Sequence, residues 1–311
     1  MIAVFGGLLA AFGALCYAFS SVAIAKSSQS ARGRGNDVLL SVVMTAAVSG
    51  MLWLLIGPPL PDYEKVVLVG VGYFVFAGLL GNVIGRLTLF RSVELAGAIE
   101  TGFIRRLIPV FAAIFAFLFL GEVITATIVI AFLLVTCGVL IMLANSSAKV
   151  TVASDVSPRN PVDKTKGRAL AIGSAAGYGG SFVARKLGMQ TLPDPLAGVF
   201  IGALTGLLWF AVSAVLRIRP RHHPRELLQW PSGWQFLAAS SMTIGQVALF
   251  FALMLTNVTA VAIISSVEMF FAAWLAGYIF KTESRPGGQF YVASILAATG
   301  VILLAVAPAL S

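Results

Sequence analysis

Long apolar stretches alternate with short polar segments along the whole chain. Ten of these stretches reach the length of about 18 to 25 residues that an α-helix needs to cross a bilayer. They lie at residues 4–25, 38–57, 66–86, 95–120, 123–144, 168–188, 196–216, 234–255, 258–280 and 288–307. This pattern predicts an all-α integral membrane protein with ten transmembrane helices.

The composition excludes a soluble domain. Of the 311 residues 59% are hydrophobic and only 11% are charged, whereas soluble chains are about 25% charged. The two cysteines, Cys16 and Cys137, both lie in apolar stretches and form neither a disulfide framework nor a metal motif. The net charge of +9 is better explained by basic cytoplasmic loops than by nucleic-acid binding. We therefore expect lipid and a small-molecule substrate as partners, no nucleic acid and no cofactor, in a monomer or homodimer.

The chain contains an internal repeat. When it is shifted by 161 positions, residues 8–23 fall on 169–184 with seven identities in sixteen positions. Similar offsets place Glu122 on Glu283 and Gly138 on Gly300. We predict two five-helix repeats at residues 1–148 and 167–311, joined by a cytoplasmic linker at 149–166. Because five is odd, the second repeat enters the membrane from the opposite side, as in inverted-repeat transporters with a site near the midplane.

Basic residues are concentrated in the loops of one side. That side carries 16 Lys and Arg residues, whereas the other carries three, namely Lys65, Arg185 and Lys186. Because cytoplasmic loops are enriched in Lys and Arg, the count predicts that both termini face away from the cytoplasm. We expect the plasma (inner) membrane of a bacterium as the location.

Charged residues inside predicted helices are the main functional candidates, because they are costly in lipid and usually face a cavity. The fourth helix carries Glu100, Arg105 and Arg106, and its mate in the second repeat carries Glu268. Arg105 and Arg106 differ by about 100° around a helix, so we do not expect both to face one cavity. The alternatives are a structural Arg–Glu pair and a helix that begins near Phe103, which would leave the first-repeat charges at the membrane surface.

Polar and aromatic residues complete the predicted binding site. Tyr17 and Tyr178 are equivalent in the two repeats, as are Ser20 and Ser181, and Asn82 is a lone amide in the third helix. The predicted substrate-binding set is Tyr17, Ser20, Asn82, Glu100, Arg105, Arg106, Tyr178, Ser181 and Glu268. Glu100 or Glu268 could also carry a proton. We interpret Glu122 and Glu283 as caps of the helices that follow them.

The chain resembles the EamA type of the drug/metabolite transporter superfamily over nearly its whole length. The resemblance rests on the two five-helix copies and on a fourth helix that runs from small residues through a proline to an acidic end. The residues of that pattern are Ala96, Ala98, Pro109, Ala112, Ala113, Gly121 and Glu122. The resemblance implies a ten-helix transporter. The family is usually described with both termini in the cytoplasm, which is opposite to the charge count.

These observations favour a secondary transporter, either an exporter or an exchanger, that moves a small polar metabolite by alternating access. An amino acid or related zwitterion fits one Arg and one Glu, since Arg binds a carboxylate bidentately and Glu binds an ammonium. Two arginines also fit a phosphate- or carboxylate-bearing anion, such as a sugar phosphate or a lipid-linked phosphate. A non-transporting membrane scaffold or accessory subunit is the alternative of another class. The chain lacks H-E-x-x-H and Gly-rich phosphate motifs, so we expect neither catalytic nor metal-binding residues.

Overall fold

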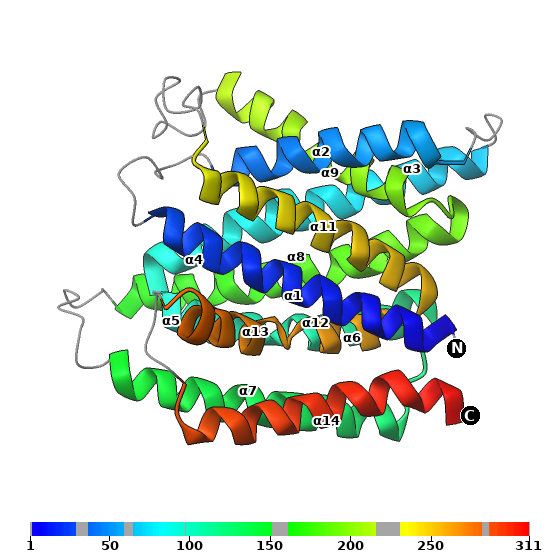
Figure 1. Ribbon diagram of the computed structural model, residues 1–311. Coiled ribbons are helices and arrows are strands. Elements are labelled where there is room, and N and C mark those ends of the chain that lie inside the picture. The colour runs from blue at the N-terminus through cyan, green and yellow to red at the C-terminus, as the bar shows by residue number, and fades with distance from the viewer. Residues whose placement is uncertain are drawn as a thin grey trace.

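The computed structural model describes residues 2–28, 37–58, 65–96, 98–150, 161–215, 231–281 and 286–310. These residues form ten helical passes and no strand. The two chain ends lie at the same end of the bundle (Figure 1). The prediction of an all-α fold with ten passes is therefore confirmed.

Each group of five passes includes one or more interrupted helices. The first group contains α1 (Ile2–Ser28), α2 (Asp37–Ile56), α3 (Lys65–Gly78), the π-helical η1 (Leu79–Gly85), α4 (Arg86–Ala96), α5 (Ala98–Ile104), the 3₁₀ segment η2 (Arg105–Leu107), α6 (Ile108–Leu120) and α7 (Ala126–Val150). The second contains α8 (Pro161–Thr191), α9 (Pro195–Val215), α11 (Gly233–Leu255), α12 (Val258–Ser265), α13 (Glu268–Trp274), the π-helical η3 (Leu275–Ile279) and α14 (Gly288–Leu310).

Two passes are longer than their apolar stretches predicted. The third runs without interruption from α3 through α4, so that Arg86 and Arg91 are helical rather than loop residues. The sixth, α8, begins at Pro161. Proline is favoured at the start of a helix, because the N–H group that it lacks would have no partner within the helix there. The far end of α8 extends to Thr191, which places Arg185 inside the helix and not in the loop assumed by the Lys/Arg count.

The two five-helix units interlock. Helix α1 packs against α11 and α13, and its mate α8 packs against α3 and α6. The second helices of the two units, α2 and α9, pair with each other, as do the fifth helices, α7 and α14. Helices α1 and α8 run in opposite directions (Figure 1), as inverted repeats require. Helices from both units therefore line the centre of the bundle.

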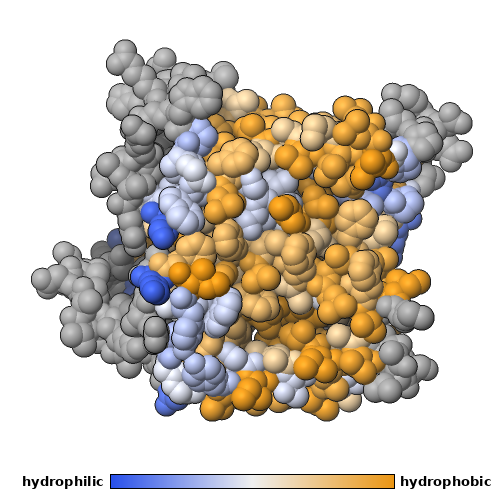
Figure 2. All heavy atoms as spheres, in the orientation of Figure 1, coloured by the Kyte–Doolittle hydropathy of each residue, from blue (hydrophilic) through white to orange (hydrophobic). Residues whose placement is uncertain are grey.

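The outer surface matches a lipid environment. Within the described residues, eight passes are long and apolar enough to cross a membrane, and α7 adds the shorter apolar stretch Ala126–Met142. Large hydrophobic side chains such as Leu54, Phe119 and Ile295 are exposed, and apolar residues cover most of the face shown in Figure 2. The interior instead holds many small residues, including Ala10, Ala112 and Ala131, which are fully buried. Small residues let membrane helices approach closely, which compensates for the lack of hydrophobic drive between helices in lipid.

Candidate functional site

The fourth helix of each repeat is interrupted at the equivalent position. In the first repeat η2 separates α5 from α6, and in the second Ser266 and Val267 separate α12 from α13. An offset of 161 places Arg105 on Ser266. Discontinuous helices near the midplane are typical of substrate sites in inverted-repeat transporters. The two interruptions thus mark the centre of the candidate site.

Different chemistry interrupts the two helices. Pro109 lacks an N–H group and therefore cannot bond the carbonyl of Arg105, which instead accepts a 3₁₀ bond from Ile108 N. In the second repeat the hydroxyl of Ser266 donates to Ile263 O at 2.6 Å. Such a bond from a serine side chain to the preceding turn bends a helix. A similar shape therefore arises although the second repeat has no proline at this position.

Glu268 carries the acidic group at the second interruption. Its Oε1 accepts a hydrogen bond from Ser21 Oγ at 3.3 Å, and its carboxylate interacts electrostatically with Arg105 and Arg106. Among the described residues, however, no ion pair within 4.0 Å joins Glu268 to either arginine. The direct structural pair considered above is therefore not formed in this conformation.

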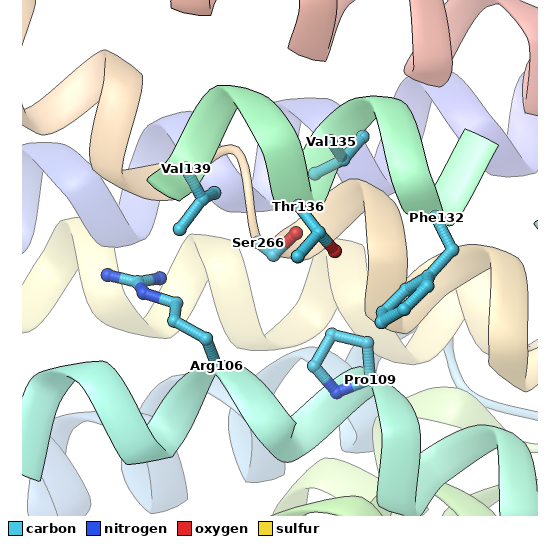
Figure 3. A pocket seen from close by; sticks show the side chains of 7 residues that line it. All are labelled: Arg106, Pro109, Phe132, Val135, Thr136, Val139 and Ser266. Carbon is cyan, nitrogen blue, oxygen red and sulfur yellow. The ribbon is translucent and has the colours of Figure 1, made fainter. Parts of the chain in front are cut away.

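Arg105 and Arg106 face different walls of the site, as their helical spacing predicts. The Arg105 guanidinium lies 5.3 Å from the ring centre of Tyr178 on α8. Arg106 and Ser266 instead lie at a cavity between the two interrupted helices and α7, where Thr136 faces them (Figure 3). The Nε atoms of both arginines are buried and have no hydrogen-bond partner in the described part of the chain. Both side chains thus keep donor capacity that the protein does not use.

Arg185 is a central residue that sequence reasoning missed. The residue is only 9% exposed, and its guanidinium lies 4.8 Å from the ring centre of Phe250 and 5.8 Å from that of Phe182. It interacts electrostatically with Tyr17 and Tyr178, and no carboxylate of the described residues lies within 4.0 Å of it. The available signal was a charge near the end of the apolar stretch 168–188, which the Lys/Arg count assigned to a loop.

Tyr17 connects the parts of the site. Its hydroxyl donates to Gln246 Oε1 at 2.8 Å and lies within electrostatic range of Arg185, Glu268 and Arg86. Tyr17 and Tyr178, which are equivalent in the two repeats, therefore both lie beside Arg185. The groups that lie near one or both tyrosines are Arg86, Arg105, Arg185, Gln246 and Glu268.

Three of the other predicted site residues, Ser181, Asn82 and Glu100, have partners elsewhere. Ser181 donates to Ala77 O at 2.9 Å, and Asn82 donates to Gly202 O at 3.0 Å. Glu100 forms ion pairs with Arg168 and with Lys164, the latter at 3.4 Å. Ser20 is buried in α1. The structure thus places Glu100 in a surface ion-pair cluster rather than beside Arg105 and Glu268.

Contacts close the bundle near both of its ends. At the end of α6, Glu122 Oε1 accepts a hydrogen bond from Val258 N at 2.7 Å, and its Oε2 accepts from Thr259 N and Oγ1 at 3.1 and 2.9 Å. Glu122 therefore caps α12 of the other repeat and not the following helix α7, so that part of the prediction is wrong. Glu283 lies outside the described residues. Lys186 Nζ binds the adjacent carbonyls Leu253 O and Thr256 O at 2.7 and 3.1 Å.

The opposite end is closed by a cationic side chain on aromatic rings. Lys26 Nζ lies 4.7 Å from the ring centre of Trp234 and 5.6 Å from that of Phe280. The cavity at Arg106 measures only about 10 Å³, roughly what one water molecule needs. A solute must therefore enter by a rearrangement of these helices.

Ten passes in two interlocked repeats, with charged groups at interrupted helices, are typical of membrane transporters. The EamA-like transporter family model matches residues 4–144 and 165–306. The chain therefore belongs to the EamA-like transporter family, which confirms the resemblance to the drug/metabolite transporter superfamily.

A solved structure supports the fold. It is described as "Crystal structure of protein", and it aligns with 96% of this chain and 97% of its own length at a TM-score of 0.69 and 19% sequence identity. At that identity the likeness concerns the fold alone. Comparison with curated proteins gives no match.

Proposed function

We propose that this protein is a secondary transporter that moves a small metabolite bearing a carboxylate or phosphate group by alternating access. The observation that carries the proposal is the charge balance at the centre of the bundle. Arg105 lies against Tyr178, Arg185 lies near both Tyr17 and Tyr178, and Arg106 lies near Arg105 and Glu268. Glu268 is the one acidic side chain found with these three arginines among the described residues.

An anionic substrate compensates for this excess of positive charge. A buried charge without a partner is strongly unfavourable, since its lost hydration is not replaced. Arginine is well suited to the task because its planar guanidinium binds carboxylate and phosphate oxygens bidentately. The unused Nε donors of Arg105 and Arg106 supply hydrogen bonds to such a group.

A zwitterion such as an amino acid remains the second candidate, favoured by Glu268. Its carboxylate lies near the arginines without an ion pair to them, so it could hold an ammonium while an arginine holds the carboxylate. The same group is the proposed proton carrier if transport is proton-coupled.

Alternating access would act on the contacts at the two ends. Opening toward the chain termini requires that Glu122 and Lys186 release α12 and α11, and opening toward the other end requires that Lys26 leave Trp234 and Phe280. We infer that the end with Lys26, Lys164 and Arg168 is cytoplasmic, because Lys and Arg mark that side. Both termini then face outward from a bacterial plasma membrane, with repeats at 1–148 and 167–311. A pair of C-terminal reporters, one active outside and one inside the cell, tests this orientation.

Counterflow in proteoliposomes tests the function. Proteoliposomes that contain the full-length protein are loaded with an unlabelled solute, and the same solute is added outside in labelled form. The solutes are dicarboxylates, sugar phosphates, amino acids and neutral sugars. We expect exchange of an anionic or zwitterionic solute, and a loss of about tenfold or more for Arg105→Gln, which removes a charged hydrogen-bond donor. Arg91→Gln is the matched control, since Arg91 is exposed and pairs with Glu94.

The possible results separate the candidate functions. Exchange of neutral sugars alone, or full exchange by Arg105→Gln, would contradict an anion-binding centre. A well-folded protein that exchanges none of the solutes would favour the scaffold alternative.

A further inference from the structure

A second polar pocket lies away from the two helix interruptions. It lies between α2, the third pass, α9 and α11, and its polar lining residues are Ser41, Thr45, Asn82, Arg86 and Gln246. The remaining lining residues are Val42, Ala203 and Met242, so that no acidic side chain of the described residues borders the pocket. Its volume is about 20 Å³, which suits one small ion or one functional group rather than a whole metabolite.

Hydrogen-bond donors dominate this lining. Arg86 Nη1 is buried and has no hydrogen-bond partner within the described residues. Gln246 uses its Oε1 to accept from Tyr17, which leaves its NH₂ group to donate. Asn82 donates one of its two N–H groups to Gly202 O at 3.0 Å. A cation and amide donors without an acid form an environment that stabilises negative charge.

The local backbone supports a functional origin for the pocket. Asn82 lies within the π-helical segment η1, and Arg86 directly follows it. Single π-helical turns are uncommon and often occur at functional sites. A buried donor of a charged group without a partner is costly, and Arg86 Nη1 is such a donor although Arg86 as a whole is only partly buried. A ligand that accepts from Nη1 would remove this cost.

We propose that this pocket binds a small anion, either a halide or a single carboxylate or phosphate group, with Arg86 as its cationic ligand. The site is distinct from the centre formed by Arg105, Arg106 and Arg185. The hydrogen bond between Tyr17 and Gln246 connects the two, because Tyr17 also interacts with Arg185 and Glu268. An anion at Arg86 orients the Gln246 amide and thereby fixes the Tyr17 hydroxyl at the central site.

Thermal unfolding of the purified full-length protein tests the proposal. Chloride or formate is titrated against gluconate, which is too large for the pocket, at constant ionic strength. We expect saturable stabilisation of the wild type and an apparent affinity lower by about 10- to 100-fold in Arg86→Gln, as expected for loss of a charged hydrogen bond. Arg91→Gln on the same helix and Arg185→Gln at the centre should keep the effect.

A second variant distinguishes a loss of anion binding from a failure to fold. Gln246→Glu keeps an acceptor for Tyr17 and gives Arg86 a carboxylate in place of the anion. We expect this variant to be at least as stable without chloride as the wild type is with it, and to lose the response to chloride. Anion stabilisation that survives in both Arg86→Gln and Gln246→Glu, or that disappears in Arg185→Gln alone, would overturn the proposal.

The transported solute distinguishes the two sources of the anion. If solute and chloride compete in the unfolding experiment, the pocket holds an anionic group of the solute. If their effects add, the pocket holds a separate ion. Neither result depends on flux, so the proposed site can be tested even if the proposed substrate class is wrong.

Discussion

Gly138 on α7 lies directly against the carbonyl oxygen of Ala293 on α14, and a Cβ atom at position 138 would be only 2.5 Å from that oxygen. The reverse contact exists as well, since a Cβ at Gly300 would be 2.8 Å from the carbonyl oxygen of Ala131. An offset of 162 places Gly138 on Gly300 and Ala131 on Ala293, so the two contacts are equivalent in the repeats. The fifth helices of the two repeats therefore meet through a pair of symmetry-related glycine contacts.

We expect Gly138→Ala to destabilise the protein by about 1–3 kcal/mol, the usual cost of overpacking a close contact. The added methyl would meet backbone, which cannot move aside as a flexible side chain can. Thermal unfolding in detergent measures the effect.

Gly173→Ala on α8 provides the matched control. Nothing lies within 4 Å of a Cβ at position 173, and alanine is a better helix former than glycine by about 0.5–1 kcal/mol. This variant should therefore be as stable as the wild type or more so. Equal destabilisation by both changes would show that helix approach at Gly138 is not the cause.

The repeat was visible in the sequence because equivalent positions in the two units make the same contacts. Gly138 and Gly300 recur for this reason. Tyr17 and Tyr178 recur as well, although Tyr17 donates to Gln246 whereas the Tyr178 ring faces Arg105. The helix interruptions were harder to predict, because Pro109 marks one and the Ser266 hydroxyl marks the other. The environment of Arg185 could not be read from hydropathy, since a charge near the end of an apolar stretch looks the same whether it lies in a loop or in the core.

Contacts between repeats were also beyond sequence reasoning. Glu122 follows α6 and precedes α7, so a cap on α7 was the natural prediction. Its actual partners, Val258 and Thr259, lie 136 and 137 positions away. Only the antiparallel packing of the two fourth helices brings the carboxylate to that helix end.

Glu122→Ala should destabilise the protein by about 1–2 kcal/mol, because the first turn of α12 loses its cap and a carboxylate favoured by the helix dipole. Glu122→Gln keeps one acceptor and should retain part of the stability. Glu94→Ala is the control, since Glu94 is exposed and pairs with Arg91 on the same helix, where such pairs contribute little. The measurement is again thermal unfolding, and the prediction fails if Glu122→Ala and Glu94→Ala behave alike.

Arg105 and Glu268 should be only weakly coupled in folding but should act together in transport. They interact electrostatically, but no direct ion pair joins them in this conformation. The coupling of Arg105→Gln and Glu268→Gln in unfolding should therefore stay well below the roughly 3–5 kcal/mol lost when a buried ion pair is broken. For transport the double variant should be no better than the worse single variant, since both side chains serve one site.

Glu100→Gln supplies the comparison for this cycle. Glu100 pairs with Lys164 and Arg168 at a partly exposed position, so its loss should cost less than about 1 kcal/mol and change flux by no more than about twofold. Recovery of folded yield in the Arg105→Gln, Glu268→Gln double variant would instead reveal a direct pair in another conformation.

Arg185→Gln should separate function from stability most sharply. Arg185 is only 9% exposed and lacks an acidic partner among the described residues. Its burial therefore costs desolvation energy that the contacts with Phe250 and Phe182 offset only in part. Neutralising it should leave the unfolding temperature unchanged or raise it, while exchange of the anionic solute falls by about tenfold or more.

Such a gain in stability with a loss of activity is typical of functional residues that are strained or unpaired in the folded protein. Arg185→Lys tests the role of the charge, because it keeps the positive charge but loses the planar, bidentate donor geometry. We expect partial exchange and a weaker apparent affinity for the solute. Arg91→Gln again controls for the removal of one positive charge. If Arg185→Gln unfolds at a lower temperature and exchanges solute normally, Arg185 is a packing residue of α8 and the anion-binding centre must be assigned to other groups.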